Sequence, residues 1–436
     1  MDGENAPLLN QISPLNDAKL FFYGLGHVYN DLCAAVWFSY TLFYFQIILE
    51  IEPTTAGSLM MLGQVADSLA TPVCGWAIDR LNKPKAWHKA GTAAVAVGFC
   101  MIFSLKPTLD SWKLLIYHTV FVIIFQIGWA IVQISHLSLI PAIAIDQRQS
   151  SNLTTVRYTA SVCCNIFVYL LTWIVLQNGE NPNNIGPKDI FKFQELIFII
   201  TALGVCTSSI FYCGIPQPNF TSQRETPQKV NKNVLKKFSI YTVSLMYMSS
   251  RLCTILNLIY VPLYLEERYS NGSDKDHGIR SAVAVVPLVS FCASLFASIL
   301  LRYKPKQFGH RLTYLVGSIF CLGGSGWIAY GIPLGSYNQL YAAVSFTGIG
   351  GSATMVSSLC LTADFIKING YGGGFVYSAV TFADKILSGG VVLLIQYLQC
   401  SPKNLCPLYY EAVLAYACSS SGILGLFSLM LLSFEY

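Results

Sequence analysis

Long apolar segments separated by short polar connections recur along the whole chain. Twelve of them are long enough to cross a bilayer, because a membrane-spanning helix needs about 20 apolar residues. They lie near residues 19–48, 55–79, 90–107, 113–141, 153–177, 193–215, 237–265, 280–301, 312–333, 338–366, 372–399 and 409–433. The pattern predicts an all-α polytopic membrane protein with twelve transmembrane helices.

A polar segment at 216–236 divides these spans into two equal sets. We therefore expect a short N-terminal tail at 1–18 and a six-helix half at 19–215. A central linker at 216–236 and a second six-helix half at 237–436 would follow. Two halves joined by a linker are typical of secondary transporters built from repeated units.

Composition and charge placement support this interpretation. The chain is 54% hydrophobic and 11% charged, whereas a soluble domain carries about 25% charged residues. Lys and Arg concentrate in the even-numbered connections, so the positive-inside rule places these connections, the linker and both termini in the cytosol. No solvated basic face is left for a nucleic-acid partner. The same orientation puts the sequon at Asn271 on the opposite side, where it can carry a glycan.

One span keeps a carboxylate near its middle. Asp67 stands in "GQVADSLATPVCGWAIDR", with Thr71 one turn later on the same face. A charge at the bilayer centre costs about 2.5–3.5 kcal/mol on insertion scales. Asp67 is therefore either protonated and used for packing or directed into a water-filled cavity. Other buried charges favour the cavity.

Polar and charged side chains occur in the spans of both halves. The candidate substrate- and ion-binding residues are His27, Asn30, Asp31, Asp67, Thr71, Gln133, His136, Arg157, Arg251, Asp364, Asp384 and Lys385. Their charges nearly cancel, so the bundle could hold a zwitterion or could pair its charges internally. Internal pairing accounts less well for the whole set, because buried pairs still lose hydration.

Other chemistries find little support. The short connections contain no nucleophile–base spacing, metal motif or phosphate loop, so we expect no enzyme activity, no cofactor and no metal. Cys400 and Cys406 flank "SPKNL" in the last non-cytosolic connection. A disulfide and two free thiols are both open there.

Several motifs resemble a known family. Gly75, Asp79 and Arg80 in "GWAIDR" match the G-x-x-x-D-R gating signature between the second and third helices of the major facilitator superfamily. The segments "GHVYNDLCAAVWFSY", "FQIGWAIVQISHLSLIP", "VRYTAS" and "FVYSAVTFADK" resemble its branch related to the glycoside–pentoside–hexuronide cation symporters. Within that branch the likeness is strongest to animal cysteine transporters of lysosomes and melanosomes, which influence pigmentation.

The resemblance implies a secondary transporter that moves a small zwitterionic solute, namely cysteine, by alternating access, with protons as candidate coupling ions. It also implies that Asp31, Asp67, Arg157 and Lys385 occupy positions where these symporters keep charged residues. Thr71 and Gln133 stand where the family has carboxylates, which weakens a sodium site and sugar recognition. A cation-coupled sugar or lipid symporter at the plasma membrane is the alternative, and a non-transporting scaffold or receptor is a third reading.

The N-terminal tail carries a candidate sorting signal. "ENAPLL" contains Glu4, Leu8 and Leu9 in the acidic dileucine pattern that clathrin adaptors bind on cytosolic tails. Together with the resemblance, it predicts a multi-pass protein of the lysosomal or melanosomal membrane.

Overall fold

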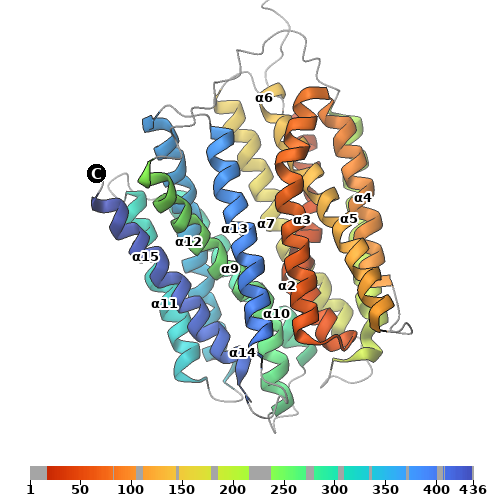
Figure 1. Cartoon of the computed structure of the whole chain (residues 1–436), viewed down its shortest axis with the longest axis vertical. Helices are drawn as coiled ribbons and strands as arrows, with labels where there is room; N and C mark the ends of the chain where they lie inside the picture. Colours follow the sequence, from red (N-terminus) through yellow and green to blue (C-terminus); the bar gives the residue numbers. More distant parts are fainter. Residues whose placement is uncertain are drawn as a thin grey trace, which may run out of the picture.

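The computed structural model is an elongated bundle of helices whose axes run roughly along its long direction (Figure 1). It describes residues 17–81, 83–104, 111–143, 147–177, 185–215, 237–271, 279–302, 309–332, 336–369, 373–399, 406 and 408–434. Its α-helices are α1 (Asp17–Leu25), α2 (Val28–Phe43), α3 (Pro53–Leu81), α4 (Pro84–Ser104), α5 (Ser111–Ser138), α6 (Ile140–Ile143), α7 (Gln147–Gln177), α8 (Ile190–Gly214), α9 (Phe238–Asn271), α10 (Ile279–Arg302), α11 (His310–Tyr330), α12 (Tyr337–Asn369), α13 (Gly373–Tyr397), α14 (Tyr409–Ala412) and α15 (Cys418–Phe434). Two π-helical turns, η1 (Tyr44–Ile48) and η5 (Val413–Ala417), continue α2 and α14, and a 3₁₀ turn, η2 (Pro187–Asp189), precedes α8.

In the described part of the chain, eleven helical segments are long and apolar enough to cross a membrane. The twelfth long helix is α3, whose 29 residues extend about 44 Å. Gln64 and Asp67 lower its apolar character, yet it packs between α5 and α13 within the bundle. With α1, α2 and η1 forming one pass and α14, η5 and α15 another, the expected twelve-span fold is confirmed.

Close helix contacts make each half a tight unit. A Cβ at Gly98 on α4 would lie 2.6 Å from the backbone nitrogen of Phe125 on α5. In the second half, a Cβ at Gly350 on α12 would lie 2.5 Å from the backbone nitrogen of Cys321 on α11. Only glycine allows backbones this close, as in small-residue packing of membrane helices. The third and fourth spans of each half are therefore packed in the same way.

The two halves share a core at one end of the bundle and have separate cores at the other. The shared core joins residues such as Trp37 and Tyr44 of the first half to Tyr260 and Val392 of the second. At the opposite end, one core surrounds Tyr23 at the start of the first half. Another core contains Ile240, Val243, Phe365 and Leu429 of the second half. In the part of the chain that the structure describes, the bundle is thus closed at the α14 end and divided at the opposite end.

Polar side chains cross the sealed end. Gln46 Nε2 on η1 donates to Gln396 Oε1 on α13 at 2.7 Å, and the Tyr410 hydroxyl donates to Gln46 Oε1 at 2.8 Å. Gln396 Nε2 in turn donates to the Tyr260 hydroxyl at 3.1 Å. These bonds connect the first half to α9, α13 and α14 of the second half, so opening this end requires breaking them.

We therefore expect Gln46→Ala to favour the form that opens at the α14 end. A hydrogen bond contributes about 0.5–1.5 kcal/mol net, which corresponds to a roughly two- to tenfold shift in population. Double electron–electron resonance between spin labels at the exposed positions Glu52 and Leu408 would measure the shift as a longer distance between the two labels. Gln194→Ala is the matched control, because Gln194 bonds Ser104 within one half at 3.0 Å. An unchanged distance in Gln46→Ala, or an equal change in the control, would contradict the assignment.

Candidate functional site

An ion pair between the halves lies at the middle of α3 and α13. Lys385 Nζ is 2.7 Å from Asp67 Oδ2 and donates to Thr71 Oγ1 at 3.2 Å. Thr71 also donates to the Asp67 backbone carbonyl at 2.8 Å. Asp67 and Lys385 are both largely buried, with side chains 8% and 17% exposed. Asp67 is thus paired with a cation of the chain itself, and neither Asp67 nor Thr71 is among the residues that line the cavity described below.

A second pair lies one residue earlier on α13. Asp384 Oδ2 is 3.5 Å from Arg251 Nε on α9, and Asp384 Oδ1 accepts a hydrogen bond from Ser388 at 3.2 Å. Among the described residues, the two Nη atoms of Arg251 have no hydrogen-bond partner within the protein. One long contact leaves most of this guanidinium available to a carboxylate, which Arg binds with two parallel bonds.

The third charged group lies where the first span breaks. His27 stands between α1 and α2, with Asn30 and Asp31 one turn ahead of it. Its Nδ1 is 3.0 Å from Asp31 Oδ2, although neither atom makes a hydrogen bond among the described residues. Its Nε2 is 2.9 Å from Arg157 Nη2 on α7. Asn30 Nδ2 also approaches His27 Nε2, at 3.4 Å. The structure thus brings together four of the residues singled out in the sequence.

Two further histidines hold this break in place. His136 Nε2 on α5 donates to the Tyr23 carbonyl at 2.9 Å, and His88 Nε2 on α4 donates to the Gly26 carbonyl at 2.9 Å. The His136 ring also stacks on Tyr23 with centroids 4.2 Å apart. A broken membrane helix frees carbonyls that need such donors. The structure therefore gives His136 a contact with the helix break, and His88, which the sequence did not single out, shares this task.

A cavity of about 210 Å³ opens at mid-depth between the halves. Its walls come from α7 of the first half and from α9, α10 and α12 of the second. The lining residues are Ser161, Val162, Asn165, Arg251, Cys253, Thr254, Asn257, Leu258, Ser290, Phe291, Ser294, Leu295, Ser298, Thr347, Gly348, Gly351, Ser352 and Met355. Hydroxyl groups predominate, and Arg251 is the charged side chain among these lining residues.

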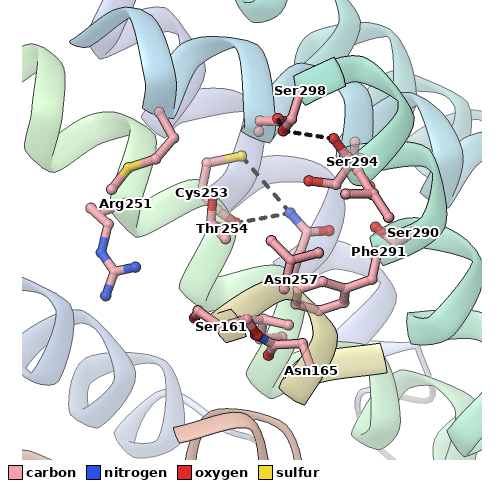
Figure 2. A pocket seen from close by; sticks show the side chains of 18 residues that line it. Ser161, Asn165, Arg251, Cys253, Thr254, Asn257, Ser290, Phe291, Ser294 and Ser298 are labelled. Carbon is pink, nitrogen blue, oxygen red and sulfur yellow. Dashed lines mark hydrogen bonds between the residues drawn. The ribbon is translucent and has the colours of Figure 1, made fainter. Parts of the chain in front are cut away.

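The amide of Asn257 is anchored on the wall of this cavity (Figure 2). Its Nδ2 donates to the Cys253 carbonyl at 2.9 Å and lies 3.5 Å from Cys418 Sγ. The amide oxygen is left for a ligand among the described groups. On the α10 side, Ser298 and Ser352 share a hydrogen bond of 2.5 Å. The cavity wall thus combines these polar groups with apolar side chains such as Val162, Leu258 and Phe291.

Most of this wall escaped the sequence analysis, which looked for charges. Ser290, Ser294 and Ser298 recur every four residues along α10. That spacing places them on one helix face and is a signal that could have been found. Arg251 alone was anticipated. Gln133 is half-buried on α5 and does not line the cavity.

Other predicted residues fall elsewhere. Gly75 makes no close helix approach, because a Cβ there would meet Ile134 at an ordinary 3.8 Å, so packing does not require a glycine at this position. Glu4, Leu8, Leu9 and Cys400 lie outside the described residues, as do the side chains of Asp79, Arg80, Asn271 and Asp364. Cys406 is disulfide-bonded, and its pairing with Cys400 stays a prediction.

Known proteins share both this sequence and this architecture. The family described as MFS/sugar transport protein matches residues 22–398. Major facilitator superfamily domain-containing protein 12 of Homo sapiens is 33% identical, over 90% of this chain and 87% of its own length. A glucuronide carrier protein homolog of Escherichia coli is 20% identical, over 83% of this chain and 77% of its own.

Solved transporters have the same fold at low identity. The nucleoside transporter NupG superposes with a TM-score of 0.72 at 12% identity, covering 95% of this chain and 99% of NupG. The xylose transporter XylE of E. coli, in a partially occluded inward-open conformation, gives 0.70 at 10% identity, covering 96% of this chain and 97% of XylE. The chain is thus a membrane transporter rather than an enzyme, and it belongs to the major facilitator superfamily, in the MFS/sugar transport protein family.

Proposed function

We propose that this transporter moves cysteine, or a closely similar small zwitterion, across the membrane of lysosomes or melanosomes by alternating access. The observation that carries the proposal is the polar cavity between the halves, with Arg251 at its edge. A carboxylate can bind this guanidinium, and the hydroxyl and amide groups can hold the polar remainder. A cavity of about 210 Å³ suits a single amino acid better than the larger ligands of typical pockets, which occupy about 300–1,000 Å³.

The ammonium group of such a solute needs an acceptor. No carboxylate is among the residues that line the cavity. Asp384 on α13 lies beside Arg251, however, and Asp67 on α3 is paired with Lys385, the next residue of α13. If the substrate carboxylate replaces Asp384 on Arg251, the freed Asp384 can accept the ammonium group. The carboxylate and the ammonium group of a zwitterion can thus each take the place of one partner in the existing Arg251–Asp384 pair.

The alternative of a cation-coupled sugar or lipid symporter fits the described residues less well. Sugar recognition by paired carboxylates is not supported, since Asp67 is engaged by Lys385 and Thr71 replaces the second carboxylate. The cavity volume of about 210 Å³ is small for the acyl chains of a lipid. The Lys385 ammonium also fills the position beside Asp67 and Thr71 that an external cation would need, so we infer that sodium does not bind there.

The direct test of the substrate is uptake of radiolabelled cysteine by organelles that carry or lack the protein. Equal uptake by the two would refute cysteine as the substrate.

We expect Arg251→Lys to reduce cysteine uptake at least tenfold, because lysine keeps the charge but loses the two-pronged geometry. Ser294→Ala should cause a smaller loss, because it removes one hydroxyl from the cavity wall. Ser209→Ala is the matched control, since Ser209 is exposed on α8 and bonds only the Val205 carbonyl of its own helix. Transport at the parental rate in Arg251→Lys would remove Arg251 from the site.

A second set of variants separates the structural and transport roles of the interhalf pair. Asp67→Asn strands Lys385 in a dry interface, and breaking a buried pair costs about 3–5 kcal/mol. We expect it to lower both the melting temperature and cysteine uptake. The double variant Asp67→Asn/Lys385→Gln should regain much of the stability, because no charge is stranded, but not concentrative uptake. Parental uptake by the double variant would reduce the pair to a packing role.

The location is tested in the N-terminal tail. Leu8→Ala with Leu9→Ala removes the dileucine part of "ENAPLL", so we expect the protein to move to the cell surface through loss of adaptor binding. Asn10→Ala with Gln11→Ala in the same tail is the control and should leave the location unchanged. Lysosomal staining that persists in the dileucine variant would mean that another signal sorts the protein.

A further inference from the structure

The contacts of His27 define which of its nitrogens carries the proton. Arg157 has only donors on its guanidinium, so the Nε2 that lies 2.9 Å from Arg157 Nη2 must accept. In the neutral ring the proton is then on Nδ1, the atom that faces Asp31 Oδ2 at 3.0 Å. His27 is therefore uncharged, accepts a hydrogen bond from the half-buried Arg157 and faces the buried Asp31.

Protonation of His27 would break its contact with Arg157. A proton added to Nε2 would turn the acceptor into a donor and place two cations in contact. The N–H···N bond from Arg157 would be lost, while the ion-pair contact with Asp31 would gain strength. The contact of Asn30 Nδ2 with Nε2 would be lost as well, so the arrangement has two states that differ by one proton and by the partners of Nε2.

The structure also provides a partner for the protonated ring. Asn30 is almost fully buried, and its Oδ1 has no hydrogen-bond partner among the described residues. Its amide nitrogen already lies 3.4 Å from His27 Nε2. A half-turn of the Asn30 amide would direct Oδ1 at the new N–H in place of Arg157.

The other polar side chains around His27 form hydrogen bonds with partners other than His27. Tyr23 on α1 accepts from His136 through its carbonyl, and the His136 ring centroid lies 5.4 Å from that of His27. His88 on α4 donates from Nε2 to the Gly26 carbonyl, so its Nδ1 accepts from the Tyr212 hydroxyl of α8 at 2.8 Å. His88 and His136 are thus held as neutral donors to the helix break. His27 differs because its acceptor nitrogen faces a cation.

The released arginine would lie next to the cavity. Arg157 and the cavity residue Ser161 are four residues apart on α7, so they share a helix face. Arg157 Nε is buried without a hydrogen-bond partner among the described residues, so the guanidinium is not fixed by a second bond there. Losing its contact with His27 therefore frees a positive charge one turn from Ser161.

We propose that His27 is a proton-binding site that controls an anion site: proton uptake at Nε2 releases Arg157 toward the cavity, where it joins Arg251 in binding the carboxylate of the solute. The identity of the solute rests on the function proposed above, whereas the proton-dependent release of Arg157 does not. By thermodynamic reciprocity, the carboxylate must strengthen proton binding by the same factor. A proton and a carboxylate-bearing solute are then taken up together.

The release can be measured without any substrate. Ser161→Cys places a thiol beside Arg157, and its modification by an anionic and a cationic methanethiosulfonate reagent is followed by mass spectrometry of that peptide. The ratio of the two rates cancels the ionisation of the thiol and reports the local charge. We expect the anionic-to-cationic ratio to rise several-fold as pH falls from about 7.5 to 5. A thiol introduced at Ser298, on the α10 side of the cavity, should show a smaller change.

Variants identify the titrating group. His27→Gln gives Arg157 an acceptor that cannot be protonated, so the ratio should become independent of pH. Asn30→Leu removes the alternative acceptor and should move the transition to lower pH. His118→Gln is the matched control, because His118 is a buried histidine that bonds Leu114 of its own helix at 2.8 Å. A flat ratio in the parent, or an equal rise in His27→Gln, would overturn the proposal.

The same variants separate this proposal from the choice of substrate. In the parent, the apparent dissociation constant for cysteine should decrease by up to tenfold for each unit by which pH is lowered across the transition. His27→Gln should abolish this dependence. A pH-dependent ratio without cysteine transport would leave the proton site standing and refute cysteine. Cysteine transport with a flat ratio would leave the function standing and refute the proton site.

Discussion

The cost of holding charge in a medium of low dielectric constant governs this protein. An unpaired ion in the bundle would be far less stable than the same ion in water, so each charged side chain described inside the spans has a neighbour that compensates it. Asp67 meets Lys385, Asp384 meets Arg251, and Asp31 meets Arg157 through His27. These pairs decide which helices lie together, and the same pairs are the groups that a charged solute can displace.

The pairs differ in how tightly they are closed, and this difference has functional meaning. The Lys385–Asp67 contact is short and has a threonine beside it, so it fastens one half to the other. The Arg251–Asp384 contact is long and leaves the guanidinium mostly unused, so it can exchange partners at small cost. The contact between His27 and Arg157 depends on the lone pair of His27 Nε2. The Lys385–Asp67 pair thus holds the halves together, the Arg251–Asp384 pair can exchange partners, and the His27–Arg157 contact can switch with a proton.

The twelve-span architecture could be predicted from the sequence, because span length depends on local composition. The presence of charged residues inside the spans could also be predicted from the sequence. Their partners could not be predicted, since Asp67 and Lys385 are hundreds of residues apart and no periodicity relates them. The cavity was missed because serine and threonine in membrane helices usually bond their own backbone, as Ser209 does, and only tertiary packing shows which hydroxyls face a common space. The proton position on His27 required the neighbouring arginine to be located first.

The joint apolar core at the α14 end has a thermal consequence. When the halves separate there, aromatic side chains such as Trp37 and Tyr260 would become hydrated, whereas other surfaces of the two halves would meet at the opposite end. Hydration of apolar surface raises heat capacity. The two orientations of the transporter therefore differ in heat capacity wherever these surfaces are unequal, and their ratio must follow a curved rather than a straight van't Hoff plot. The side of the membrane to which the empty carrier opens then depends on temperature.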